Sequence, residues 1–170
     1  SATWVDFSRD GQWAAYIDRQ GGDLWRTKSD GTERVQLTFP PMDVELPRWS
    51  PDGKWIAFTG KMPGKPWKIH LISPEGGSPQ QLIPGEAHEG APTWSPAGNS
   101  IVFGNVLCEA SGTCAIRCFD LSTRQLSTLP GSEGLRTARW SPDGRYVAAI
   151  EPKQQALMLF DSRTQKWVKL

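Results

Sequence analysis

One short phrase occurs four times in this chain of 170 residues and constrains its fold more than any other feature. From serine to serine, the copies lie 42, 45 and 46 residues apart. A repeat of this length is typical of the four-stranded blades of a β-propeller. The sequence therefore predicts an all-β chain with four four-stranded antiparallel blades. The copies are FSRDGQW (7–13), WSPDGKW (49–55), WSPAGNS (94–100) and WSPDGRY (140–146).

Each phrase has the composition of a turn between two strands. In the second copy Pro51 presets φ, Asp52 favours the second corner of the turn, and Gly53 supplies a left-handed residue. Arg9 replaces the proline in the first copy, and Ala97 replaces the aspartate in the third. We therefore assign the phrase to turn and core structure. The residues so assigned are Trp49, Asp52, Gly53, Trp94, Gly98, Trp140, Asp143 and Gly144.

Four short apolar segments follow one another in each repeat, bounded by turn residues, as expected of buried strands. Helical spacing of apolar residues is absent, so almost no helix is predicted. The fourth strands are expected to centre on Leu37, Leu82, Leu129 and Leu170. A propeller is thus expected over 1–170, with blades at approximately 2–38, 45–83, 91–129 and 136–170.

The overall composition excludes several function classes. A formal net charge of +1 gives no basic stripe for nucleic acid and no polybasic membrane patch. No apolar run approaches the roughly 20 residues that span a bilayer, so no membrane insertion is expected. Nine tryptophans suit thin sheets that need bulky side chains between them.

The three cysteines are Cys108, Cys114 and Cys118. We expect three buried or half-buried thiols, because a free cysteine packs as a small hydrophobic residue. A disulfide between Cys108 and Cys114 is the alternative, and it would leave Cys118 unpaired. No metal or other cofactor is expected, because structural zinc needs four N or S ligands and the two histidines lie in other repeats.

Turns in an antiparallel meander alternate between the two ends of the sheet. The repeated phrase and the turn between third and fourth strands therefore share one end of each blade, the turn end. The opposite, loop end carries the variable segments 39–45, 60–66, 84–90, 105–114 and 130–136. Binding residues usually lie on such variable loops. The candidate partner-binding residues are Asp43, Glu45, Lys61, Glu86, His88, Glu89, Glu133 and Arg136.

Sequence signals for catalysis are weak. A G-x-S-x-G serine elbow and a phosphate-binding P-loop are both missing from the sequence. His70 is expected to pack within a strand, and His88 to lie in a solvated acidic loop. Arg48 and Arg139, each before a repeated tryptophan, are expected to line a central channel or pair with an adjacent blade, with capture of an anion as the alternative. These observations predict no catalytic residues and no enzyme.

The phrase WSPDG, followed by an apolar strand and a further apolar strand, resembles the TolB-type propeller repeat. The resemblance covers Trp4 to Leu170; Trp49–Gly53 and Trp140–Gly144 match it fully, and the other two copies in part. It implies a bacterial module that binds a protein or peptide, with a weak preference for an extracytoplasmic location. The resemblance leaves open a gating or accessory propeller of a hydrolase, a sensor propeller of a winged-helix regulator or receptor kinase, and an isolated or engineered fragment.

The ends of the repeats raise the question of ring closure. The chain opens on an innermost strand and finishes on an outermost one, with no spare strand to complete another blade. Two chains could join as an eight-bladed ring, four blades could close alone, or the chain could be part of a larger propeller. We favour a homodimer that closes the ring, because a head-to-tail pair satisfies both apolar ends.

Overall fold

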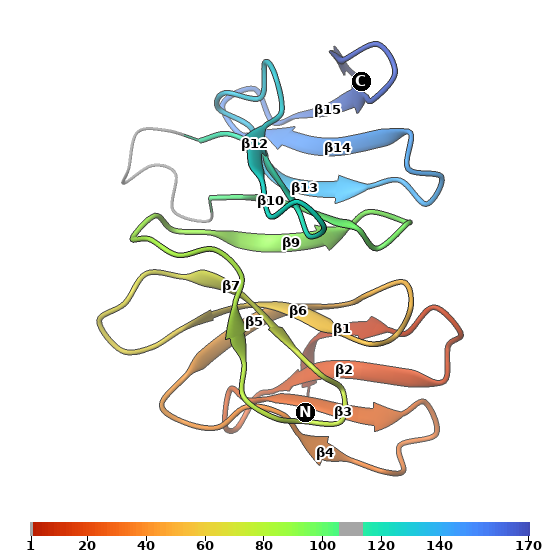
Figure 1. Ribbon diagram of the computed structural model, residues 1–170, viewed down its shortest axis with the longest axis vertical. Coiled ribbons are helices and arrows are strands. Elements are labelled where there is room, and N and C mark those ends of the chain that lie inside the picture. Colours follow the sequence, from red (N-terminus) through yellow and green to blue (C-terminus); the bar gives the residue numbers. More distant parts are fainter. Residues whose placement is uncertain (1, 106–113) are drawn as a thin grey trace. The chain divides into compact units, whose positions relative to one another are not determined.

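The computed structural model describes residues 2–105 and 114–170, and these residues form four four-stranded antiparallel sheets with no helix (Figure 1). They cluster into two compact units, Ser1–Glu89 and Gly90–Leu170, each with two sheets. In every sheet the strands follow one another in chain order. This is the blade topology that the repeats predict, and the all-β, four-bladed fold is confirmed.

The first unit contains blades one and two. Blade one comprises β1 (Ala2–Phe7), β2 (Trp13–Asp18), β3 (Leu24–Lys28) and β4 (Val35–Gln36). Blade two comprises β5 (Asp43–Trp49), β6 (Ile56–Lys61), β7 (Lys68–Ile72) and β8 (Gln80–Gln81).

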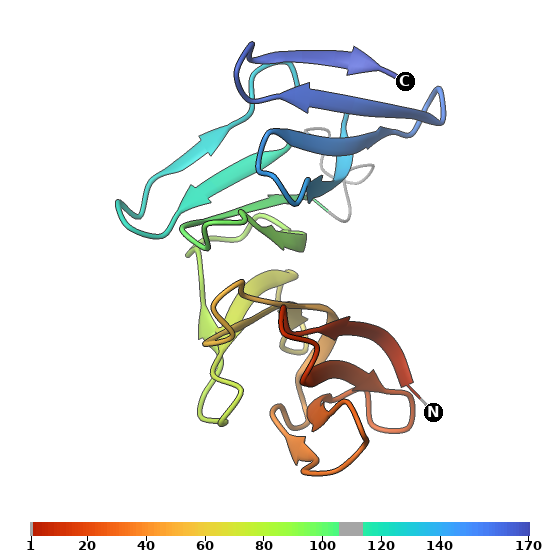
Figure 2. The same cartoon turned by 90° about the vertical axis from the view of Figure 1, so that its right-hand side faces the viewer.

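The second unit contains blades three and four. Blade three comprises β9 (Gly90–Trp94), β10 (Ser100–Gly104), β11 (Arg117–Asp120) and β12 (Leu126–Thr128). Blade four comprises β13 (Arg136–Trp140), β14 (Tyr146–Glu151), β15 (Ala156–Asp161) and β16 (Lys166–Lys169), whose ribbons run side by side in Figure 2.

A serine hydroxyl closes the turn in every copy of the repeated phrase. In the second copy Ser50 Oγ accepts the backbone N–H of Trp55 at 2.9 Å and donates to Asp52 Oδ1 at 2.6 Å. Gly53 lies at φ 71° and so provides the left-handed corner. In the third copy, where alanine replaces the aspartate, Ser95 Oγ donates instead to Asn99 Oδ1 at 2.9 Å. The recurrent serine and aspartate are thus explained by turn geometry.

The expectation that the fourth strands centre on the repeated leucines is wrong, because each strand ends one residue before its leucine. The leucine nevertheless remains part of each blade. Leu37 N–H donates to the Leu24 carbonyl at 2.8 Å just beyond β4, and Leu82 does the same to Ile69 beyond β8. Equivalent bonds recur in blades three and four. Each leucine therefore ties the end of its fourth strand to the start of the third.

Every innermost strand contains a bulge that the sequence analysis did not anticipate. The pairing register shifts within β1, β5, β9 and β13. Each shift includes a non-glycine residue in the left-handed region, at φ between 50° and 55°. A bulge bends its strand and increases the local twist. The residues concerned are Trp4, Leu46, Ala91 and Thr137.

The blades of each unit are joined by packing and by hydrogen bonds, among them one from Arg26 Nε of blade one to the Pro74 carbonyl of blade two at 2.6 Å. The core of the first unit includes Leu24, Trp49 and Phe58, and that of the second includes Val147 and Phe160. Burying such side chains contributes roughly 1.5–3 kcal/mol each. The innermost strands are also tied, since a repeated tryptophan donates its backbone N–H to the previous blade: Trp49 to Asp6 Oδ2 at 2.8 Å and Trp140 to Thr93 Oγ1 at 3.4 Å.

Arg48 takes part in the same junction. Its guanidinium lies 3.8 Å from Asp6 Oδ1 and donates to the Pro47 carbonyl at 2.8 Å. Pairing with the adjacent blade is therefore confirmed for Arg48. Arg139 makes the equivalent bond to the Ala138 carbonyl at 2.8 Å.

The cysteines differ from the expectation of three thiols. Cys114 is disulfide-bonded and Cys118 is a free thiol. The expectation of three free thiols is therefore wrong, because Cys114 is bonded. Cys108 lies outside the described residues. Burial, followed by the nearby Asp120 carboxylate, raises the pKa of the Cys118 thiol, so this thiol is not activated as a nucleophile.

Candidate functional site

A pocket of about 270 Å³ opens at the loop end of blade two, and we name it the loop pocket. Its walls come from the end of β6, the segment that follows it, β7, the end of β8 and the connection that leaves the blade. A volume near 300 Å³ is at the small end of ligand pockets. The lining residues are Gly60, Lys61, Met62, Lys65, Pro66, Lys68, His70, Gln81, Pro84, Gly85 and Glu86.

The connection 84–89 is held firmly against the start of β7. Glu89 N–H donates to the Trp67 carbonyl at 2.8 Å, and Trp67 N–H donates to His88 Nδ1 at 3.2 Å. The Lys68 ammonium donates to the Ala87 carbonyl at 3.2 Å. These bonds hold the connection in place, so the pocket wall is preformed.

A buried ion pair lies behind this wall. Lys68 Nζ is 2.6 Å from Glu89 Oε1, and the two side chains are only 4% and 1% exposed. Glu89 Oε2 also accepts the Ile69 N–H at 3.5 Å. Burial removes water from both charges, so the pair is tolerable only because each partner satisfies the other. The pair therefore locks the connection to β7.

His70 forms the floor of the pocket. Its ring stacks on Phe58 with centroids 5.5 Å apart, and Nδ1 lies 3.2 Å from the Lys68 carbonyl. A carbonyl can only accept, so Nδ1 carries the proton and Nε2 is a bare acceptor in the neutral ring. Burial, followed by the Lys68 charge, lowers the pKa of His70 below its ordinary value of 6.5, against the effect of the backbone bond. The imidazole is therefore neutral at pH 7.

Gly60 leaves the space in which this ring sits. A Cβ at position 60 would lie 3.0 Å from Phe58 Cε2 and 3.1 Å from His70 Nδ1. A side chain there would push both rings. The glycine is required by close approach, and it keeps the imidazole at the base of the pocket.

Two lysines and two carboxylates lie at the rim of the pocket. Lys61 Nζ lies 4.6 Å from the centre of the Trp67 ring and 3.4 Å from Asp43 Oδ2, which is 67% exposed. Lys65 is exposed and makes no ion pair with any described residue. Glu86 is the one carboxylate among the described lining residues. Exposed ion pairs of this kind are weak, so Lys61 remains available to a ligand.

The structure brings together five of the eight candidate residues. Lys61 and Glu86 line the loop pocket, and Asp43, His88 and Glu89 contact its walls. The expectation of a solvated acidic loop is wrong for Glu89, which is buried against Lys68, and incomplete for His88, which accepts a backbone bond. No sequence pattern indicates that the connection 84–89 is hydrogen-bonded to the start of β7.

The other three candidates lie elsewhere. Glu45 is half-buried in β5 opposite Thr59. Glu133 is exposed and Arg136 half-buried in the second unit. Lys65, Lys68 and His70 were not among the candidates, although the lysine spacing in GKMPGKPWK could have indicated a cationic loop.

The described residues offer neither a metal centre nor a membrane-spanning helix. Within residues 2–105 and 114–170 no group of three or more His, Cys, Asp and Glu side chains is placed to hold a metal ion. The same residues contain no helix of sufficient length and hydrophobicity to cross a membrane.

Comparison by sequence gives relatives that match parts of the chain. No protein-family model matches it. The chain is 32% identical over 112 residues to the uncharacterized peptidase YuxL of Bacillus subtilis, a match that covers 60% of this chain and 17% of that protein. It is 31% identical over 75 residues to the Tol-Pal system protein TolB of Syntrophus aciditrophicus, covering 41% and 16% respectively. The chain thus spans less than a fifth of either relative.

Comparison by structure gives propellers over nearly the whole chain. A protein described as TolB from Agrobacterium tumefaciens superimposes with a TM-score of 0.83 at 19% identity, covering 99% of this chain and 61% of that one. TolB from Acinetobacter baumannii superimposes with a TM-score of 0.72 at 23% identity, covering 99% and 40%. The TolB-type propeller fold is confirmed.

The expectation that the chain is not an enzyme is overturned by the same comparisons. Besides the peptidase YuxL, the similar structures include a puromycin hydrolase with a TM-score of 0.74 at 19% identity, covering 99% of this chain and 28% of that one. They also include an oligogalacturonate lyase with a TM-score of 0.75 at 15% identity, covering 97% and 51%. Propellers with this fold therefore occur in enzymes. The lack of a catalytic motif in one propeller segment is no argument that the protein is not an enzyme.

Proposed function

We propose that this chain, a set of TolB-type β-propeller repeats, is a module that binds a protein or peptide partner at the loop end of its blades. The observation that carries the proposal is the loop pocket, in which Lys61, Lys65 and a buried imidazole line a cavity whose wall is preformed by hydrogen bonds. Preformed sites bind more tightly because less ordering is needed on association. The eight candidate residues remain predictions of the contact surface.

A peptide selection tests this proposal. The purified chain would be immobilised and offered a random peptide library, and enriched peptides would be titrated against variants. Lys61→Ala and Lys65→Ala, at the loop end, are expected to weaken binding. Lys54→Ala is the matched control, because Lys54 is an exposed lysine on the turn end of the same blade.

Two results would contradict the proposal. One is the lack of any enriched peptide. The other is enriched peptides whose affinity falls as much with Lys54→Ala as with the two loop-end variants, because binding would then not be localised at the loop end.

A second candidate function is that of a gating or accessory propeller within a longer hydrolase. It is favoured by the similarity to the peptidase YuxL and by the match to 28% of the puromycin hydrolase chain. The test is the sequence of the gene on both sides of this segment. A neighbouring α/β-hydrolase domain with a G-x-S-x-G elbow would support this candidate, and neighbours without one would exclude it.

We also infer that two copies of the chain join as a homodimer that closes an eight-bladed ring. The supporting observation is that blades one and four have exposed apolar side chains: Trp4 and Phe7 in β1 are 52% and 58% exposed, and Val168 and Leu170 at the end of blade four are 56% and 67%. Sedimentation equilibrium of the purified chain is expected to give a dimer mass. A well-folded monomer would contradict the inference.

An extracytoplasmic location is proposed on two grounds. The repeats resemble those of TolB, and Cys114 is disulfide-bonded. Disulfides persist mainly in oxidising compartments. Fractionation of cells that express the whole gene is expected to place the protein outside the cytoplasm, and recovery with the cytoplasmic fraction would contradict this.

A further inference from the structure

We infer that the loop pocket recognises an acidic residue of a peptide, with the carboxylate held by the lysine rim and a neighbouring peptide N–H donated to His70 Nε2. This inference deepens the proposed function and rests on it. It assigns the chemistry of the ligand, which the proposed function leaves open.

The neutral His70 ring places a hydrogen-bond acceptor at the pocket. His70 is 92% buried, since its exposed fraction is 8%, yet it lines the cavity. Nδ1 is committed to the Lys68 carbonyl, and Nε2 has no hydrogen-bond partner among the described residues. A ligand N–H is the group that can donate to this nitrogen.

Charged side chains surround that acceptor. Three lysines and one glutamate line the pocket. Lys68 is neutralised by the buried Glu89, whereas Lys61 is held only by an exposed aspartate and Lys65 by no described carboxylate. Glu86 on the lining and Asp43 beside Lys61 offset the charges of Lys61 and Lys65, so the ammonium that makes no ion pair with a described residue, that of Lys65, is the group that a ligand carboxylate can reach. A carboxylate bonds to lysine more strongly than a neutral group does.

The occupant must present an anion at the rim and an N–H donor at the floor, within about 270 Å³. A peptide supplies an N–H at every residue except proline. An aspartate or glutamate residue adds the carboxylate a few bonds away. Free carboxylates such as acetate have the anion but lack the donor.

Binding of two matched peptides tests the inference. The probes are N-acetylated, C-amidated pentapeptides with four glycines around a central glutamate or a central glutamine, titrated by two-dimensional NMR at pH 7. The glutamate peptide is expected to bind about tenfold more tightly than the glutamine peptide. Lys65→Gln is expected to remove most of this difference, while Lys54→Gln at the turn end leaves it unchanged.

His70 has a separate signature. His70→Asn keeps a donor for the Lys68 carbonyl but removes the Nε2 acceptor. It is expected to weaken the glutamate and glutamine peptides by the same factor, about fivefold, because both carry the N–H. If His70 had only a structural role, its replacement would also reduce the preference for the glutamate peptide over the glutamine peptide, which depends on Lys65. Far-UV and near-UV circular dichroism would establish that each variant is folded.

The outcomes separate this inference from the proposed function. Equal affinity of the two peptides, or displacement of the glutamate peptide by an equal concentration of acetate, would overturn the acidic-peptide assignment. Library peptides that bind through the loop end but contain no acidic residue would also overturn it, and would leave the proposed function standing. A library that yields no binder would remove both.

Discussion

The repeated aromatic residue occupies different surroundings in different blades. Trp49 is 7% exposed and packs in the core of the first unit. Phe7, at the equivalent position of the first copy, is 58% exposed. Sequence repetition therefore does not give equal burial, because burial depends on whether a neighbouring blade covers the position.

Substitution of these two residues measures that difference. Trp49→Ala is expected to lower the free energy of unfolding by about 3–5 kcal/mol through lost packing and the cavity left behind. Phe7→Ala, the matched control, is expected to cost less than about 1 kcal/mol. Urea denaturation followed by tryptophan fluorescence or circular dichroism provides the comparison. Equal losses for the two variants would contradict it.

The buried ion pair should behave differently from a surface pair. Glu89→Ala is expected to destabilise the chain by about 3–5 kcal/mol, because the Lys68 charge would remain buried without its partner. The double variant Lys68→Met with Glu89→Leu is expected to recover most of the loss, because two apolar groups need no compensation. Lys54→Ala, which removes an exposed pair at 3.9 Å, should change stability by less than about 0.5 kcal/mol. A Glu89→Ala variant as stable as Lys54→Ala would contradict the argument.

The buried imidazole predicts a pH dependence of stability. Because the pKa of His70 is lowered in the folded chain, the unfolded state binds more protons at mildly acidic pH. The stability due to neutral His70 is thus complete above pH 6.5 and falls as the pH decreases towards the folded-state pKa. The slope is at most about 1.4 kcal/mol per pH unit. His70→Asn should show a flatter profile between pH 7 and 5, and an unchanged profile would contradict this assignment.

At the scale of the element, the turn phrase is a structural unit with interchangeable parts. Aspartate or asparagine accepts the serine hydroxyl, and glycine provides the left-handed corner at φ between 71° and 74° in all four copies. Arg9 is the only departure from proline at the first corner. Its backbone N–H makes no bond to another described residue, so a proline ring would remove no hydrogen bond.

Arg9→Pro is therefore expected to stabilise the chain. Proline fits the first corner in the other three turns, and it reduces the conformational freedom of the unfolded state by about 0.4–1 kcal/mol. Arg9→Ala is the control, since it removes the same side chain without the ring. Thermal unfolding should show a higher midpoint for the proline variant than for alanine; a lower midpoint would mean that the first turn has a different backbone from the others.

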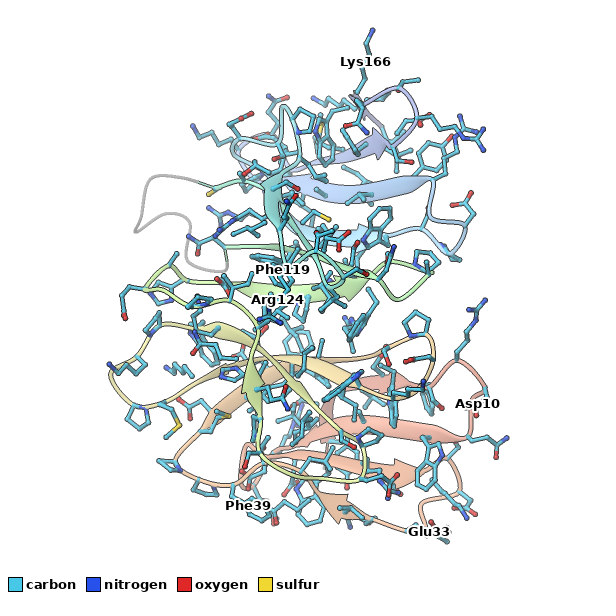
Figure 3. All side chains as sticks on the ribbon, viewed as in Figure 1. Asp10, Glu33, Phe39, Phe119, Arg124 and Lys166 are labelled. Atoms are coloured by element: carbon cyan, nitrogen blue, oxygen red, sulfur yellow. The ribbon has the colours of Figure 1, made fainter. Side chains whose placement is uncertain are left out.

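Side chains at the turn end of a blade stabilise its turns, whereas side chains at the loop end of blade two line a pocket. Asp10 and Glu33, from the two turns of blade one, project at the same end in Figure 3. The carboxylate of Asp10 is occupied by its own turn, and the Ser8 hydroxyl bond lowers its pKa. The repeated phrase gives every blade the same kind of turn end. The loop ends differ from blade to blade in length and charge, and the loop end of blade two contains the loop pocket.

At the scale of the whole molecule, the chain consists of two compact units. In repeat proteins each repeat contacts mainly its neighbours, so stability is close to a sum of local terms. Local unfolding often follows such units. A substitution is therefore expected to increase local unfolding mainly in the unit that contains it.

Hydrogen exchange tests this expectation. Glu89→Ala is expected to raise amide exchange rates more in residues 2–89 than in residues 90–170. The parent chain and Lys54→Ala serve as references. An equal rise in both units would show that the chain unfolds as one cooperative body.

The sequence by itself determined the blade fold, the strand order and the turn end, because these depend on local chemistry repeated four times: the serine, aspartate and glycine of each turn, and apolar strands between turns. Only the tertiary structure decided which residues form the loop pocket. Lys68 and Glu89 lie 21 residues apart, and their burial depends on how the connection 84–89 lies against β7. The bulges in the innermost strands, each with a left-handed residue, were also not predicted, because a bulge is defined by the register of pairing with the next strand and not by the residues of its own strand alone.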